Sequence, residues 1–123
     1  MLKGSCNCKG VAFTVEPLPG SSACHCGQCR KQSGHHWASA EGRVQDFSIS
    51  GEVRWYAASG SAKRGFCPTC GCFLFWKHND EEKMSFSLGV LDGPTGLRLQ
   101  KHIFTAFKGD YYDIADGLPQ REN

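Results

Sequence analysis

The stretch Cys67-Pro68-Thr69-Cys70-Gly71 decides the fold of this chain, because it holds two thiols on one tight turn. Pro68 sets the turn, and Gly71 leaves the backbone after it free to adopt unusual angles. This is the pattern of a zinc knuckle, and it indicates a metal site most strongly when a second cysteine pair occurs elsewhere in the chain. Such a pair is present at Cys6 and Cys8.

The remaining cysteines form a triple and a single residue. The triple lies in Cys24-His25-Cys26-Gly27-Gln28-Cys29, and Cys72 follows the knuckle. Two pairs make a closed four-cysteine site, the structural type of zinc site, whereas three ligands leave the fourth position open, as in catalytic zinc sites. We therefore expect a closed zinc site on Cys6, Cys8, Cys67 and Cys70, and an open zinc site on Cys24, Cys26 and Cys29.

Two other uses of the cysteines remain open at this point. The knuckle could be a thioredoxin-like redox motif, although no strand–helix–strand pattern surrounds it. The 8 cysteines could also pair as disulfides in a small secreted protein. Residues 1–8 contain no apolar segment of the kind found in signal peptides. We therefore expect a cytoplasmic protein whose thiols are reduced.

Length, composition and charge restrict the remaining alternatives. A chain of 123 residues predicts a single domain over residues 1–123, and its 15 glycines and 5 prolines favour strands and turns over a helical bundle. No apolar run reaches the roughly 18–20 residues that span a membrane. Seven negative thiolates and two Zn²⁺ ions would change the formal net charge from +2 to −1, so no nucleic-acid partner is indicated.

Short runs of β-branched and aromatic residues predict a mainly β fold of short antiparallel strands. The first two runs form a hairpin around the turn at residues 6–10, and Glu16-Pro17-Leu18-Pro19-Gly20 is expected to break the second strand. One helical turn is expected over residues 28–32, and little order is expected after residue 119. The predicted strands are residues 2–5, 11–15, 36–40, 47–51, 53–56, 64–66, 73–76, 83–88, 102–104 and 111–114.

The order of these motifs resembles the glutathione-dependent formaldehyde-activating (GFA) family, also called the CENP-V/GFA domain family. The resemblance covers about residues 4–119, nearly the whole chain. It is carried by Gly4-Ser5-Cys6-Asn7-Cys8, Cys24-His25-Cys26-Gly27-Gln28-Cys29-Arg30-Lys31, Arg64-Gly65-Phe66-Cys67-Pro68-Thr69-Cys70-Gly71, Leu91-Asp92, His102-Ile103-Phe104 and Asp116-Gly117-Leu118-Pro119.

The resemblance implies a zinc-stapled β fold of the Mss4-like type, with a structural zinc on the four-cysteine site. It implies a second zinc on Cys24, Cys26 and Cys29, which would be the catalytic residues and the place where glutathione binds. The reaction that it implies is that of an S-(hydroxymethyl)glutathione synthase, a carbon–sulfur lyase that joins glutathione to formaldehyde. Many members of the family have no established substrate, and the partners that the resemblance implies are a small-molecule thiol, glutathione, and an aldehyde.

Several basic residues near the cysteines are candidates for binding the two carboxylates of glutathione. Arg30 and Lys31 directly follow the triple, and Lys63 and Arg64 precede the knuckle. For Lys31 and Lys63 we favour an ordinary solvated charge. Arg30 and Arg64 are the two residues that we predict to bind glutathione, because a guanidinium pairs with a carboxylate through two hydrogen bonds.

Four histidines and the eighth cysteine could add to the chemistry. The candidates for a general acid or base are His25, His35, His36 and His102, and a structural role competes with that interpretation at each position. His25 lies between two ligands and is expected to point away from the metal. For Cys72 we favour a small buried side chain at the start of a strand, over an alternative zinc ligand or a redox-sensitive thiol.

Two functions of other classes are compatible with parts of the pattern. A non-catalytic module that binds and carries glutathione or another thiol would show the same motifs as the enzyme. A zinc ribbon that binds nucleic acid or protein would need a basic stripe with interleaved aromatic residues. The 14 lysines and arginines are scattered along this chain instead.

Overall fold

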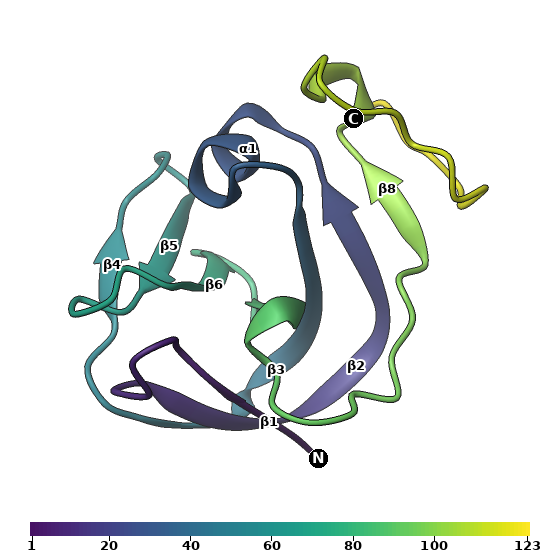
Figure 1. Ribbon diagram of the computed structural model, residues 1–123. Helices are drawn as coiled ribbons and strands as arrows, with labels where there is room; N and C mark the ends of the chain where they lie inside the picture. Colours follow the sequence, from purple (N-terminus) through teal and green to yellow (C-terminus); the bar gives the residue numbers. More distant parts are fainter. The chain divides into compact units, whose positions relative to one another are not determined.

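The computed structural model describes all 123 residues, and these form two compact units that are interleaved in sequence (Figure 1). The first unit contains residues 1–19 and 40–96, and the second contains residues 20–39 and 97–123. A single domain over the whole chain stays a prediction. No helix of the chain is long and apolar enough to cross a membrane.

The predicted mainly β, antiparallel fold is confirmed. The sheet runs in the order β1-β2-β3-β7-β6-β5-β4, and β8 pairs with β2 in parallel. A single α-helix and two 3₁₀ turns, Leu88–Val90 and Thr105–Phe107, complete the secondary structure. The elements are β1 (Leu2–Ser5), β2 (Ala12–Cys24), α1 (Gly27–Ser33), β3 (Trp37–Ser50), β4 (Arg54–Tyr56), β5 (Ala62–Phe66), β6 (Phe73–His78), β7 (Lys83–Ser87) and β8 (Lys101–Ile103).

The hydrophobic core of the first unit is built around Phe13 of β2. The ring of Phe13 lies edge-on to Phe75 of β6 at 5.1 Å and to Phe86 of β7 at 6.0 Å between ring centroids. Both partner rings are fully buried, and burying an aromatic ring of this size stabilises the fold by about 1.5–3 kcal/mol. Gly4 faces Phe13 across the hairpin, where a Cβ atom would lie 2.6 Å from the ring. The hairpin therefore depends on glycine at that position.

Two strands are longer than the sequence predicts. The expected break at residues 16–20 is wrong, because β2 continues through Pro17 and Pro19 to Cys24. One edge of β2 is unpaired between Val15, where pairing with β1 ends, and Ser22, where pairing with β8 begins. Proline, which lacks an N–H donor, is tolerated on such an unpaired edge. The runs at residues 36–40 and 47–51 also belong to one strand, β3, instead of two.

The second unit holds the end of β2, α1, the start of β3, β8 and the C-terminal tail. The helical turn expected at residues 28–32 is confirmed as α1. The strand expected at residues 111–114 is wrong, since these residues form no ladder. The tail is more ordered than expected, because the backbone N–H of Arg121 donates to the carbonyl of His102 at 2.9 Å and Gln120 bridges His102. This pairing holds the C-terminus beside β8.

Two cysteine sites and a buried histidine network

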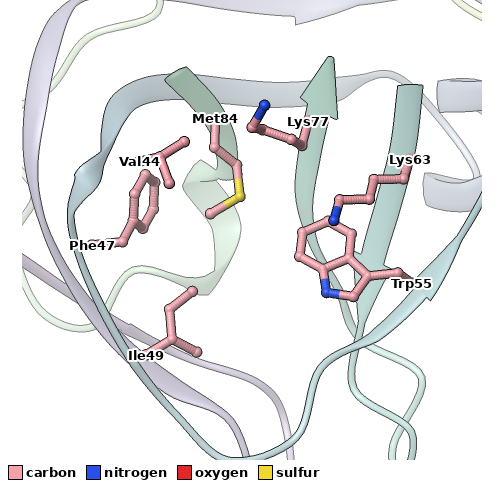
Figure 2. A pocket seen from close by; sticks show the side chains of 7 residues that line it. All are labelled: Val44, Phe47, Ile49, Trp55, Lys63, Lys77 and Met84. Carbon is pink, nitrogen blue, oxygen red and sulfur yellow. The ribbon is translucent and has the colours of Figure 1, made fainter. Parts of the chain in front are cut away.

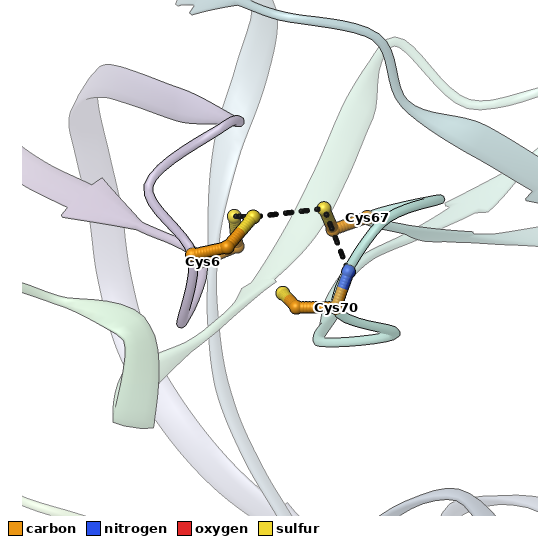
Figure 3. A group of neighbouring side chains, drawn as sticks. Cys6, Cys67 and Cys70 are labelled. Carbon is orange, nitrogen blue, oxygen red and sulfur yellow. Dashed lines mark hydrogen bonds between the residues drawn. The ribbon is translucent and has the colours of Figure 1, made fainter.

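The four-cysteine group forms where the β1–β2 turn meets the knuckle of the first unit. The Sγ atoms of Cys6, Cys8, Cys67 and Cys70 all lie within 4.8 Å of one another. Figure 3 shows Cys6 on one loop, turned toward Cys67 and Cys70 on the other. The sulfur–sulfur distances are 3.6 Å for Cys6 and Cys8 and 3.7 Å for Cys8 and Cys67. Four sulfurs around a zinc ion at about 2.3 Å lie about 3.8 Å apart, so the group fits a tetrahedral zinc.

Backbone N–H groups of the knuckle favour the thiolate form of its two cysteines. The N–H groups of Thr69 and Cys70 donate to Cys67 Sγ at 3.4 and 3.5 Å. The N–H of Cys70 is the largest cause of the lowered pKa of Cys67. The N–H of Cys72 is the main cause that lowers the pKa of Cys70 to about 6. Because metal ions bind the thiolate form of cysteine, these N–H groups favour metal binding at the knuckle.

The three-cysteine group lies at the junction of β2 and α1 in the second unit. Cys24 ends β2, Cys26 is the N-cap of α1, and Cys29 lies in its first turn. Cys26 Sγ accepts a hydrogen bond from the N–H of Cys29 at 3.4 Å, in the way that a serine or aspartate caps a helix. This cap places two sulfurs on the same side of the turn. The three Sγ atoms lie within 4.8 Å of one another.

The crowding of the three thiols affects their protonation. The pKa of Cys24 is raised, first by hydrogen bonding with the thiols of Cys26 and Cys29 and then by burial. A cation would have to displace these protons, which is the usual coupling between metal and proton binding at cysteine sites. A donor set made only of sulfur suits zinc. None of the 8 cysteines forms a disulfide in this structure.

A chain of four hydrogen-bonded side chains begins next to the three-cysteine group. His25, between Cys24 and Cys26, is fully buried, and His102 is only 3% exposed. His25 Nδ1 is bonded to the hydroxyl of Tyr112, and His25 Nε2 lies 2.9 Å from His102 Nδ1. His102 Nε2 in turn lies 2.8 Å from a carboxylate oxygen of Asp116. All four side chains belong to the second unit.

The carboxylate at one end fixes the direction of these hydrogen bonds. A carboxylate can only accept, so His102 donates from Nε2 and, when neutral, accepts at Nδ1. His25 then donates from Nε2 and accepts at Nδ1 from the Tyr112 hydroxyl. Burial, followed by the neighbouring charge of His36, lowers the pKa of His25 to about 4, which agrees with a neutral ring. The backbone N–H of His25 also donates to the carbonyl of Ile103 at 3.0 Å, so the residue is held on three sides.

The two predicted glutathione contacts, Arg30 and Arg64, lie in different units, each beside one of the lysines for which a solvated charge was favoured. Arg30 and Lys31 are on α1, directly after the three-cysteine group, and Lys31 is exposed. The Nε atom of Arg30 is buried without a hydrogen-bond partner, which is rare for a polar group in a native structure. Lys63 and Arg64 are on β5 in the first unit, and Arg64 is buried with its guanidinium 5.5 Å from the ring centre of Phe73.

The remaining candidates differ in exposure. His35 is exposed, and His36 is half-buried with its Nδ1 atom unpartnered. Burial is the first cause of the lowered pKa of His36. Cys72 is half-buried against the core of the first unit and belongs to neither cysteine group. This placement agrees with its interpretation as a small packed side chain.

Sequence reasoning misses Tyr112 and Asp116 as parts of this network. The pattern at residues 111–114 predicts a strand, and Asp116 belongs to a segment that predicts a turn. The histidines at positions 25 and 102 are the one sequence feature that points to such a network. If both rings are buried, each needs hydrogen-bond partners, and polar residues such as Tyr112 and Asp116 can provide them. Lys108 secures Tyr112 by donating to its carbonyl at 2.6 Å, with its Nζ atom 4.9 Å from the centre of the Tyr112 ring.

Comparisons with known proteins agree with this geometry. The family model described as glutathione-dependent formaldehyde-activating enzyme matches residues 1–107. An uncharacterized lyase of Schizosaccharomyces pombe is 27% identical over 117 residues, which cover 93% of this chain and 85% of that protein. The crystal structure of a Rhodobacter sphaeroides protein matches with a TM-score of 0.65 and 26% identity, covering 76% of this chain and 91% of that chain.

The match extends over most of the chain and includes every cysteine of both groups. The family description and the lyase relative together indicate a lyase. Both cysteine groups have the donor type and spacing to hold a metal ion. The chain therefore belongs to the glutathione-dependent formaldehyde-activating enzyme family.

Proposed function

We propose that this protein is a zinc-dependent carbon–sulfur lyase that joins glutathione to formaldehyde or a related aldehyde, and breaks the same adduct in reverse. The observation that supports the proposal most directly is the group of three converging thiols at Cys24, Cys26 and Cys29. A four-cysteine group would complete the coordination of a zinc ion, whereas three cysteines leave one position for another ligand. The thiol of glutathione has the soft donor atom that such a position favours.

In this proposal the four-cysteine group holds a structural zinc and the three-cysteine group holds the catalytic one. A zinc ion at the three-cysteine group would supply a coordination position at which the pKa of an incoming thiol falls, so that the thiolate is present at neutral pH. The protein's own part is to fix the three sulfurs. The cap between Cys26 and Cys29 and the buried hydrogen bonds of His25 both restrict the turn that carries them.

Arg30 is the residue that we propose to bind a carboxylate of glutathione. It follows Cys29 directly, and its Nε atom is buried without a partner. A bound carboxylate would satisfy that atom and pair with the guanidinium through two hydrogen bonds. Such a contact orients the peptide, and orientation is a large part of the rate gain when two reactants are held together. Arg64, in the first unit, remains a second proposed contact.

The reaction is balanced without a further reactant. The sulfur–carbon bond forms as the carbonyl π bond breaks, and the proton lost by the thiol ends on the new hydroxyl oxygen. Zinc is not oxidised or reduced in these steps. The proposed partners are therefore one thiol and one aldehyde, with no nucleic acid and no membrane. A cytoplasmic location follows only from the expected reduced state of the thiols.

If the protein only carries glutathione, it should bind the peptide without accelerating the reaction with the aldehyde. The test is exchange between glutathione, formaldehyde and their adduct at equilibrium, followed by NMR, with and without the protein. We expect acceleration by the native protein, loss of that acceleration in Cys26→Ser, and little change in Cys72→Ser, which removes a thiol outside both groups. Glutathione binding by the native protein with no acceleration of exchange would support the carrier and remove the enzyme.

A further inference from the structure

A pocket in the first unit lies on residues that neither cysteine group uses. Figure 2 shows the side chains that line it, which come from β3, β7, β6, β5 and β4, neighbours in the order of the sheet. The cavity measures about 280 Å³, just below the roughly 300–1,000 Å³ of typical small-molecule sites. It is lined by Val44, Phe47, Ile49, Trp55, Lys63, Lys77 and Met84.

The aromatic wall of the pocket is held in place by its neighbours. Trp55 stacks on Phe75 at 6.2 Å between ring centroids and 26° between planes. Its cross-strand partner is Gly65, where a Cβ atom would lie 2.9 Å from the Trp55 ring and 2.9 Å from Val53. The absence of a side chain at Gly65 therefore makes room for the indole. The wall is preformed, which reduces the entropy lost when a ligand binds.

Two lysines stand side by side on this pocket. Lys63 and Lys77 are direct partners in the β5–β6 register, so their side chains leave the same face of the sheet. Like charges in this position repel each other. Lys63 Nζ lies 4.4 Å from the centre of the Trp55 ring, and Lys77 Nζ donates to the carbonyls of His78 and Glu81. Neither ammonium group pairs with a carboxylate.

One further lysine of the first unit, Lys83, differs from this pair because it has carboxylate partners. Lys83 of β7 forms ion pairs with Glu41 at 3.2 Å and Glu81 at 3.9 Å. On the opposite wall, Val44 and Ile49 are 38% and 40% exposed, so apolar surface beside the lysines is open to solvent. The pocket thus combines two ammonium groups that have no carboxylate partner with an accessible apolar wall.

We infer that this pocket binds a small carboxylate with a flat apolar body, such as an aromatic acid. The carboxylate lies between the ammonium groups of Lys63 and Lys77 and relieves their repulsion. The apolar body covers Ile49, Phe47 and Val44. The inference uses none of the residues proposed for lyase activity, so it stands or falls independently of that function.

The experiment titrates 2-naphthoate into the zinc-loaded protein and follows the backbone and indole N–H resonances by NMR. We expect saturable shifts confined to the seven lining residues and their neighbours, with the Trp55 indole among the largest. The neutral isostere 2-naphthamide should bind about tenfold more weakly, because it loses charge-assisted hydrogen bonds. Lys63→Gln and Lys77→Gln should each also reduce the affinity for naphthoate about tenfold. Neither substitution should change the affinity for 2-naphthamide.

Lys83→Gln is the matched control, since it removes a lysine of the same unit that is already paired and does not line the pocket. It should bind naphthoate as the native protein does. Equal affinity for naphthoate and naphthamide would overturn the inference, as would naphthoate affinity that the Lys63→Gln/Lys77→Gln double variant retains. Resonance shifts that map to residues outside the pocket would also contradict the inference. So would a failure of naphthoate to bind because a second copy of the protein occupies the pocket. A preserved spectrum of each variant shows that its fold is intact.

Discussion

His25 and His102 are joined by a hydrogen bond of 2.9 Å between Nε2 and Nδ1, although 77 residues separate them in the chain. The bond links the loop that carries the three-cysteine group to β8. The hydrogen-bond network extends from His102 to Asp116 at one end and from His25 to Tyr112 at the other. The geometry of the cysteines thus depends on residues close to the C-terminus.

Replacing His102 should destabilise the protein through His25. In His102→Ala the buried Nε2–H of His25 loses its acceptor, and an unsatisfied buried donor costs about 1–3 kcal/mol. His102→Gln should lose less, because the amide can accept from His25 and donate to Asp116. Urea unfolding measures both variants. His35→Ala, at an exposed histidine, should change stability little, and a loss equal to that of His102→Ala would argue against the network.

The same substitutions should change the metal site as well as stability. Cobalt(II) bound in place of zinc gives absorption bands that report the arrangement of its thiolate ligands. We expect His102→Ala to change the bands of the three-cysteine group and leave those of the four-cysteine group as they are. Unchanged bands at both groups would reduce the network to a purely structural role.

Stability should depend on pH through Asp116. The hydrogen bond from His102 is the largest cause of the lowered pKa of the Asp116 carboxyl. A carboxyl whose pKa is lower in the folded state stabilises the fold above its ordinary pKa and loses that contribution as the pH falls through the lowered value. The stability difference between the native protein and Asp116→Asn should therefore be constant above about pH 5 and shrink in stronger acid.

Urea unfolding across a pH series measures this difference, and Asp113→Asn provides the control because Asp113 is exposed on the same segment. That control should track the native protein at every pH. A stability difference for Asp116→Asn that grows on acidification would have the wrong sign and would rule out the His102–Asp116 contact as its source.

Glycine at position 4 should be required by the core. An alanine there places a Cβ atom 2.6 Å from the Phe13 ring, and such overpacking costs about 1–3 kcal/mol. Gly60→Ala is a suitable comparison, because a Cβ atom at that position would have open space for 4 Å around it. Thermal melts of both variants test the difference. Equal melting temperatures would mean that the hairpin accommodates the methyl group.

The four-cysteine group should be essential to folding, while Cys72 should not. Structural zinc contributes on the order of 10 kcal/mol or more to small metal-bound domains. We therefore expect Cys70→Ser, or complete chelation of zinc, to abolish the cooperative thermal transition. Cys72→Ser should retain it. A cooperative transition that survives full removal of the metal would show that the hydrophobic core suffices alone.

The cysteine groups could be predicted from sequence because their ligands lie in short local patterns. A pair such as Cys67 and Cys70 is held by its own turn, so its spacing already indicates its geometry. The mainly β fold was also predictable, since runs of β-branched and aromatic residues are a local signal, and the helical turn at α1 was expected within the segment that carries the three cysteines. These features depend little on the rest of the chain.

Features that depend on distant partners could not be predicted in the same way. Pro17 and Pro19 indicate a break, and only the pairing of β2 with separate partners on either side of them shows why the strand continues. Tyr112 was expected in a strand, but its role in the structure is the hydrogen bond between its hydroxyl and His25. The tail is ordered by backbone hydrogen bonds between His102 and residues 119–121. No local pattern contains this information.

The proposed role of the three-cysteine group is tested best by the zinc content of the native protein and of Cys26→Ser. Both proteins are measured with and without glutathione, and X-ray absorption reports the ligands of the bound metal. We predict about two zinc ions per native chain and about one in the variant. Glutathione should add a fourth sulfur ligand to one of the two native sites. One zinc in both proteins, with no change in sulfur coordination when glutathione is added, would contradict the proposed role of the three-cysteine group.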